Sequence, residues 1–67
     1  MLELTVNGEA RTASPGTRLS ELVRELGLDG RKIAVERNLE IVPRSLYGDV
    51  ALSSGDRIEI VQFVGGG

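Results

Sequence analysis

The sequence contains no cysteine and no histidine, and its 67 residues include one tyrosine, one phenylalanine and no tryptophan. Without cysteine the chain has no disulfide, no thiolate nucleophile and no ligand for a zinc finger or an iron–sulfur cluster. Without histidine it has no imidazole base, no Ser-His-Asp triad and no histidine-ligated metal. A chain of this length forms one small core with little room for a deep pocket. We therefore expect neither an enzyme nor a metal-binding protein.

Long apolar runs and an excess of positive charge are also missing. The longest apolar run is only a few residues, and no basic segment followed by an apolar stretch stands at the N-terminus. We therefore expect neither a membrane span nor a signal peptide, and predict a cytoplasmic protein. Eight basic and ten acidic residues give a formal net charge of −2. The basic residues are scattered, whereas a phosphate backbone is bound by clustered Lys and Arg, so nucleic acid is not expected as a partner.

The N-terminal residues show the pattern of a β-hairpin. Leu2, Leu4 and Val6 alternate with polar residues, as in a strand that buries one face. Asn7-Gly8 follows at once and favours a two-residue type I′ turn, because both residues tolerate a positive φ. We predict a second strand over residues 9–13, antiparallel to the first.

The next segment has the period of an amphipathic helix. Its apolar positions recur at i, i+3, i+4 and i+7 and form a single stripe: Leu19, Leu22, Val23 and Leu26. Thr17 offers a hydroxyl group as the N-terminal cap. Gly27 is expected to end the helix in the left-handed conformation, with Leu28 folding back on the last turn.

Extended patterns resume after the helix. Strands are predicted around residues 33–35, 40–42 and 57–64, and Pro43 favours an edge position for the second of these. Residues 45–47 resemble a single turn with Leu46 or Tyr47 tucked beneath it. Three aspartates, Asp29, Asp49 and Asp56, stand in turns, where carboxylates usually bond the local backbone, and no calcium-loop spacing surrounds them.

These elements predict an α+β fold, a β-grasp (ubiquitin-like) roll with a mixed sheet of four to five strands and one main helix packed across one face. The final strand is expected in the middle beside the first, which the right-handed crossover rule permits. We predict a β-grasp domain over residues 1–64 and a flexible glycine tail over residues 65–67. The inward-facing set of the sheet is Leu2, Leu4, Val6, Ile33, Val35, Ile58 and Ile60.

The tail Gly65-Gly66-Gly67 is the feature that ordinary packing does not explain. Three glycines at a chain end are also typical of a frayed terminus or a cloning scar. However, an α-carboxyl group at Gly67 is ionised at neutral pH and needs no local base to act as an oxygen nucleophile. Glycine also fits a narrow tunnel because it has no Cβ, and three extended residues reach roughly 10 Å. The pattern indicates a protein substrate whose tail enters the active sites of its partners.

The strand before the tail has a break in its pattern. If Ile58 and Ile60 face the core, the same alternation turns Val61 and Phe63 outward. Either a β-bulge returns Phe63 to the core, or these residues form an exposed apolar spot beside the tail. In the second case Val61, Phe63 and Val64 are candidates for partner docking.

Several segments are similar to one known family. They are the Asn7-Gly8 turn, Ile41-Val42-Pro43-Arg44-Ser45, Tyr47, Gly55-Asp56-Arg57-Ile58-Glu59-Ile60-Val61 and Phe63-Val64-Gly65-Gly66-Gly67. Through them nearly the whole chain resembles ThiS, the ubiquitin-like sulfur carrier family of bacterial thiamine biosynthesis. The VPRS segment and the GDRIEIV…FVGGG ending are the most specific parts.

The resemblance implies a function for the last residue. The carboxylate of Gly67 would be adenylated with ATP by a ubiquitin-activating-like adenylyltransferase and then converted to a thiocarboxylate. A cysteine desulfurase is the implied sulfur source, and thiazole synthase is the implied acceptor. The chain itself is expected to bind no cofactor. The functional ending of the family matches Gly66 and Gly67, with Gly65 as a further match in members that end in three glycines.

Three alternatives stay open. The small subunit of molybdopterin synthase usually has prolines before its final glycines, whereas Phe63-Val64 stands there in this chain, which favours thiamine. A carrier for tRNA thiolation shares the fold, the tail and the activation step. A non-catalytic β-grasp interaction module belongs to a different class, and its binding would survive removal of Gly66 and Gly67.

Overall fold

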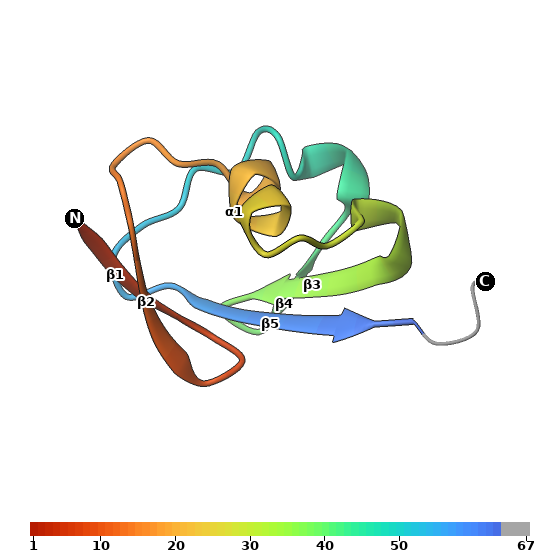
Figure 1. Ribbon diagram of the computed structural model, residues 1–67, viewed down its shortest axis with the longest axis horizontal. Coiled ribbons are helices and arrows are strands. Elements are labelled where there is room, and N and C mark those ends of the chain that lie inside the picture. The colour runs from red at the N-terminus through yellow and green to blue at the C-terminus, as the bar shows by residue number, and fades with distance from the viewer. Residues whose placement is uncertain (64–67) are drawn as a thin grey trace.

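The structure is a computed structural model, and it describes residues 1–63. One helix crosses one face of a five-stranded mixed sheet (Figure 1). The elements are β1 (Leu2–Val6), β2 (Glu9–Ala13), α1 (Leu19–Glu25), β3 (Ile33–Arg37), β4 (Glu40–Val42) and β5 (Arg57–Gln62), with short 3₁₀ helices η1 (Gly30–Lys32) and η2 (Arg44–Leu46). This architecture confirms the predicted α+β β-grasp fold.

The strand order is β2-β1-β5-β3-β4, so β5 lies in the centre of the sheet. It runs parallel to β1 and antiparallel to β3, as the prediction for the final strand required. β4 lies at an edge of the sheet. Pro43 follows this strand, and its missing N–H group is tolerated there because an edge strand has no neighbour on one side. A central β5 carries the chain directly from the core to residue 63.

Both hairpins turn on residues with a positive φ. Asn7 and Gly8 have φ values of 50° and 82°, and Val6 pairs with Glu9 across them, which confirms the predicted type I′ turn. Asn38 and Leu39 form the corresponding turn between β3 and β4, with φ values of 54° and 71°. Asparagine therefore holds the first turn position in both hairpins.

The helix ends as predicted. Gly27 has a φ of 73°, its N–H group donates to the carbonyl of Arg24 at 2.9 Å, and Leu28 N donates to Val23 O at 3.1 Å. These two bonds form a Schellman motif, in which a glycine accepts the left-handed conformation without a Cβ clash. Leu28 packs against the core as the accompanying apolar contact.

The prediction for the start of the helix is wrong. Arg18, one residue later than Thr17, is the N-cap, and the Glu21 carboxylate accepts a hydrogen bond from its backbone N–H at 2.9 Å. The chain before the helix is still extended, because Thr17 O accepts from Leu52 N at 2.9 Å and Arg18 forms a bridge with Ala51. This distant pairing keeps Thr17 out of the cap position.

The core lies between the helix and the inner face of the sheet. Its buried residues are Leu4, Leu19, Leu22, Val23, Ile33, Val35, Tyr47, Leu52, Ile58 and Ile60. Of the predicted inward set, Leu2 and Val6 are only partly buried. Tyr47 is the residue tucked under η2, whereas Leu46 is exposed. Full burial of one such large side chain stabilises the fold by about 1.5–3 kcal/mol.

Asp56 is the buried charged residue among those that the structure describes. Its carboxylate accepts hydrogen bonds from Ser53 N at 2.8 Å, Arg37 Nε at 2.9 Å and Asn38 Nδ2 at 3.0 Å. Burial alone would raise the pKa of Asp56, but the hydrogen bonds from these donors and the charge of Arg37 outweigh it, so the pKa is lowered. The predicted backbone bonding of this turn carboxylate is confirmed, and it also ties β5 to the β3–β4 turn.

Asp29 behaves in the same way at the surface. The side chain of Arg31 donates to its carboxylate at 2.9 and 3.1 Å, and Arg31 N donates to it at 2.9 Å. The side-chain hydrogen bonds are the main cause of a pKa lowered to about 2, and the backbone bond adds to it. This aspartate therefore supports the start of η1.

Candidate functional site

The candidate site lies where β5 leaves the sheet. Pairing with the β3 side continues to the last described residue, because Phe63 N donates to the carbonyl of Lys32 at 2.8 Å. Figure 1 shows this end of β5 at one end of the long axis of the molecule. Val64 and the tail Gly65–Gly67 lie outside the described residues, so the roles assigned to them stay predictions.

No bulge interrupts β5 within the described residues. The register with β3 is continuous, from Arg37 opposite Ile58 to Ile33 opposite Gln62. The bulge alternative is therefore wrong, and Val61 and Phe63 are 62% and 55% exposed as whole residues. The alternative of an exposed apolar spot beside the tail is confirmed.

The exposed spot extends over two more strands. Ala34 of β3 lies opposite Val61, and Ile41 of β4 lies opposite Glu36, which places both on the sheet face that points away from the helix. Ile41 is 67% exposed. We call the set Ala34, Ile41, Val61 and Phe63 the outer patch.

Sequence reasoning found only half of the outer patch. Alternation with Val42 could have shown that Ile41 points outward, but only the strand order places it on the same face as Val61. Ala34 gave no signal, because a single alanine in a strand is ordinary. Glu36 and Glu59 lie on the same face beside these residues, so the outer patch combines apolar side chains with an acidic margin. Exposed apolar side chains gathered on one sheet face are a feature of protein interaction sites.

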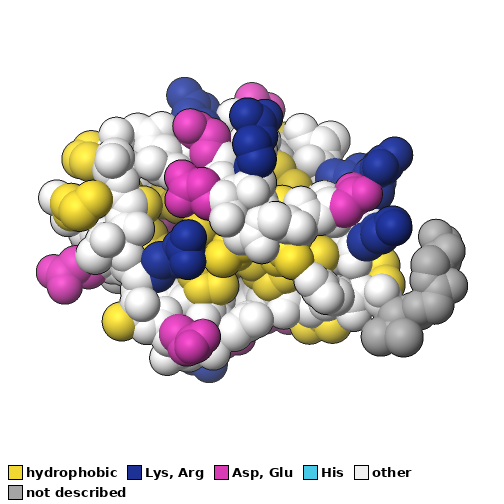
Figure 2. Space-filling model, in the orientation of Figure 1, with side chains coloured by type: hydrophobic (Ala, Val, Ile, Leu, Met, Phe, Trp, Pro, Cys, Tyr) yellow, Lys and Arg dark blue, Asp and Glu magenta, His cyan; other side chains and the backbone are white. Residues whose placement is uncertain are grey.

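Basic side chains lie at the same end of the molecule (Figure 2). Lys32 belongs to η1 and is held beside Phe63 by the backbone hydrogen bond between them. Arg31 of η1 forms an ion pair with Asp29 at 2.9 Å. The root of the tail therefore combines an apolar sheet face with positive charge at its margin.

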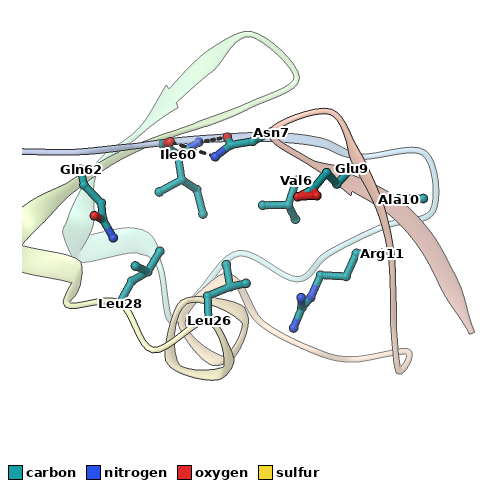
Figure 3. Close-up of a pocket in the computed structure, with 9 residues that line it drawn as sticks. All are labelled: Val6, Asn7, Glu9, Ala10, Arg11, Leu26, Leu28, Ile60 and Gln62. Atoms are coloured by element: carbon teal, nitrogen blue, oxygen red, sulfur yellow. Dashed lines mark hydrogen bonds between the residues drawn. The ribbon is translucent and has the colours of Figure 1, made fainter.

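A shallow groove of about 470 Å³ lies on the helix side of the same strand end. Leu26 and Leu28 contribute from the helix end, and Val6 and Ile60 face them from the sheet (Figure 3). Of the polar residues around it, Arg11 lies 3.7 Å from the carboxylate of Glu25. The groove is thus an apolar recess between helix and sheet with a charged margin.

The described part of the chain has neither a metal-binding cluster of side chains nor a membrane-spanning helix. Within residues 1–63 no three or more His, Cys, Asp or Glu side chains come together as a possible metal site. No helix in this part of the chain is long and apolar enough to cross a membrane.

A model of the ThiS family matches residues 4–67. This chain belongs to the ThiS family. The resemblance seen in the sequence is therefore confirmed. The match includes the glycine ending, which the structure does not describe.

Three similar proteins agree with this assignment. The sulfur carrier protein ThiS of Bacillus subtilis (strain 168) is 39% identical over 67 residues, which is all of both chains. The crystal structure of the thiamine biosynthesis protein ThiS from Geobacter metallireducens has a TM-score of 0.83 at 30% identity, covering 98% of this chain and all of that one. A thiazole synthase of Paramagnetospirillum magneticum is 54% identical over 66 residues, 98% of this chain, but the chain spans only 20% of that protein.

Proposed function

We propose that this protein is a sulfur carrier of thiamine biosynthesis and that its reactive group is the carboxylate of Gly67. The observation that carries the proposal is the match along the whole length of a protein named as the sulfur carrier ThiS. An exposed apolar patch at the root of the glycine ending supports the same role. The chain acts as a co-substrate of other enzymes and is not itself an enzyme.

The chemistry needs no side chain of the carrier. A carboxylate oxygen of Gly67 attacks the α-phosphorus of ATP, pyrophosphate leaves, and the resulting mixed anhydride makes the carbonyl carbon electrophilic. The outer sulfur of a persulfide, supplied through a cysteine desulfurase, then attacks that carbon, and AMP leaves. A second thiol cleaves the S–S bond of the resulting acyl disulfide, which leaves the thiocarboxylate on Gly67 and a disulfide between the two thiols. Stabilisation of the phosphate charge comes from the adenylyltransferase, through Arg, Lys or a metal ion of that enzyme.

The folded body serves as the docking element. In our proposal the adenylyltransferase covers the outer patch, on which Phe63 and Val61 are the largest exposed side chains next to the tail. Val64 extends this contact, and Gly65, Gly66 and Gly67 enter the active site, where the absence of Cβ atoms allows close approach of the enzyme backbone. Since ATP drives the first step, we assign the reaction to the cytoplasm.

Thiazole synthase is the partner that takes the sulfur. One similar protein named thiazole synthase includes a segment 54% identical to this chain within its own length. A carrier segment joined to a synthase meets it at high effective concentration, which supports a direct transfer between the two.

Intact-mass measurement tests the proposal. The purified protein is incubated with its adenylyltransferase, ATP, a cysteine desulfurase and cysteine, and a gain of about 16 Da is expected when sulfur replaces one oxygen at the covalently activated carboxylate. The matched control lacks Gly67. No gain in the wild type, or an equal gain in the control, would contradict the proposal.

Tracing labelled sulfur separates the carrier pathways. We expect the label in thiazole when thiazole synthase is added. Label that enters tRNA or molybdopterin, and not thiazole, would assign the chain to another pathway with the same activation chemistry.

A further inference from the structure

The side chain of Asn7 completes the sheet at the tail end of β5. Asn7 Oδ1 accepts a hydrogen bond from Ile60 N at 2.7 Å, and Asn7 Nδ2 donates to Ile60 O at 3.2 Å (Figure 3). Both backbone groups of Ile60 on this side are therefore satisfied by one side chain. The turn motif that the sequence indicated thus has a second role, in the strand that leads to the tail.

The geometry follows from the end of β1. Thr5 N and Asn7 N donate to Asp56 O and Ile58 O, at 3.0 and 2.8 Å, and continue the parallel ladder along β5. The chain then turns away at Gly8, so no further residue of β1 reaches Ile60. The carboxamide of Asn7 takes the place of the next peptide group, because it carries one donor and one acceptor with similar spacing.

Few other residues can do this. Asparagine tolerates the positive φ of 50° that the turn requires. Aspartate lacks the donor, serine lacks the second polar atom, and glycine has no side chain. The combination of turn conformation and carboxamide therefore selects asparagine at position 7.

Asn38 provides a counterpart at the opposite end of β5. Its Oδ1 accepts from Arg57 N at 2.9 Å, its backbone N donates to Arg57 O at 2.8 Å, and its Nδ2 donates to Asp56 at 3.0 Å. Like Asn7, it occupies the first position of a hairpin turn with a positive φ. The two asparagines hold the two ends of the strand, and only Asn7 holds the end next to the tail.

The hydrogen bonds from Asn7 to Ile60 lie directly before the outer patch in the sequence. Ile60 is buried, and the next residues, Val61 and Phe63, are exposed members of the patch. Beyond Ile60 the described part of β5 pairs with the β3 side alone, through the register of Gln62 with Ile33 and the bond from Phe63 N to Lys32 O. Asn7 is therefore the last support that the β1 side gives to this stretch.

We propose that Asn7 is a positioning residue for the carrier reaction. By fixing Ile60 it keeps residues 61–63 in sheet conformation, so the adenylyltransferase meets a preformed docking surface and a fixed starting point of the tail. Without these hydrogen bonds, residues 61–63 must be ordered each time the carrier binds the adenylyltransferase. The loss of conformational entropy then weakens binding. The inference rests on the proposed carrier function.

The test compares Asn7→Gly with Asn38→Gly. Glycine accepts both turn conformations, so each variant keeps its hairpin and loses two side-chain hydrogen bonds to β5 or its flank. Two quantities are measured. They are the exchange protection of the Phe63 amide by NMR and the steady-state kinetics of pyrophosphate release by the adenylyltransferase with ATP, at varied carrier concentration.

We expect Asn7→Gly to lower the protection of the Phe63 amide about tenfold and to raise KM for the carrier about tenfold, with kcat unchanged. Asn38→Gly should lower the melting temperature at least as much, yet keep Phe63 protection and KM within about twofold of the wild type. An unchanged Phe63 protection or KM in Asn7→Gly would overturn the inference, as would an equal change in Asn38→Gly. If the wild type releases no pyrophosphate, the proposed carrier function itself is wrong. If the wild type reacts but the variants behave in one of these contradicting ways, only the inference about Asn7 is wrong.

Discussion

Replacement of Asp56 by asparagine is expected to remove a large part of the stability of the fold. Asp56 is only 5% exposed, and three donors converge on its carboxylate: Ser53 N, Arg37 Nε and Asn38 Nδ2. Asn has nearly the same volume, so the variant leaves no cavity. It removes the charge and replaces one of the two accepting oxygens by an NH₂ group, so at least one of the three donors faces another donor.

The magnitude follows from the lost bonds. Breaking a buried, hydrogen-bonded ion pair costs roughly 3–5 kcal/mol, because donors are left buried without a partner. The side chain of Arg37 is 29% exposed, so water replaces part of its lost bond and the lower end, about 3 kcal/mol, is expected. A domain of this size has a total stability of about 3–10 kcal/mol. The change therefore removes at least about a third of the total.

Urea unfolding followed by far-ultraviolet circular dichroism measures the effect. The control is D29N, which changes an aspartate whose ion-pair partner Arg31 has a largely exposed side chain, and it should unfold close to the wild type. For D56N the midpoint should fall strongly at an unchanged m-value. If the D56N midpoint coincided with that of D29N, the assigned role of the buried carboxylate would be refuted.

Three further outcomes are expected. The pKa of Asp56 is lowered in the folded protein, so the ionised carboxylate stabilises the fold fully above its ordinary pKa of 3.8. This stabilisation is lost as the pH falls through the lower pKa of the folded state. Acid-induced unfolding should therefore depend less on pH in D56N. In thermal melts G27A, at a φ of 73°, should lower the free energy of unfolding by about 1 kcal/mol. G48A should lower it much less, because the nearest atom to the added Cβ lies 3.9 Å away. Equal losses in the two variants would contradict the role of Gly27 as the helix cap. F63S should raise the KM of the adenylyltransferase for the carrier, while it lowers the free energy of unfolding by less than about 1 kcal/mol. An unchanged KM would argue against docking at Phe63.

Local patterns predicted the elements of this fold accurately. The apolar stripe of α1, the Asn7-Gly8 turn and the Gly27 cap each depend on residues close in sequence, and each is found where the pattern placed it. The error at the cap, Thr17, has a distant cause, since pairing with Leu52 keeps that residue extended. Here the short-range signal failed because a partner far along the chain competes with it.

The candidate site could be predicted only in part. The change of phase in β5 raised two alternatives for Phe63, and its exposure followed only from the continuous register with β3. Ala34 and Ile41 joined the patch because β3 and β4 lie beside β5 in the sheet. The local pattern of the sequence shows which residues alternate in a strand, but it does not show which strands are neighbours in the sheet.

The sequence by itself determined the chemistry open to this protein. It contains no cysteine thiolate and no histidine imidazole, and for this reason we predicted the Gly67 carboxylate as the reactive group. The tertiary structure decided how the strand before the glycines is held. Asn7 and Asn38 hydrogen-bond to residues of β5 that are distant in sequence, and Asp56 joins the second of these contacts. Such contacts exist only once strand pairing has brought the turns beside β5, because a polar side chain finds its hydrogen-bond partner in space and not along the chain.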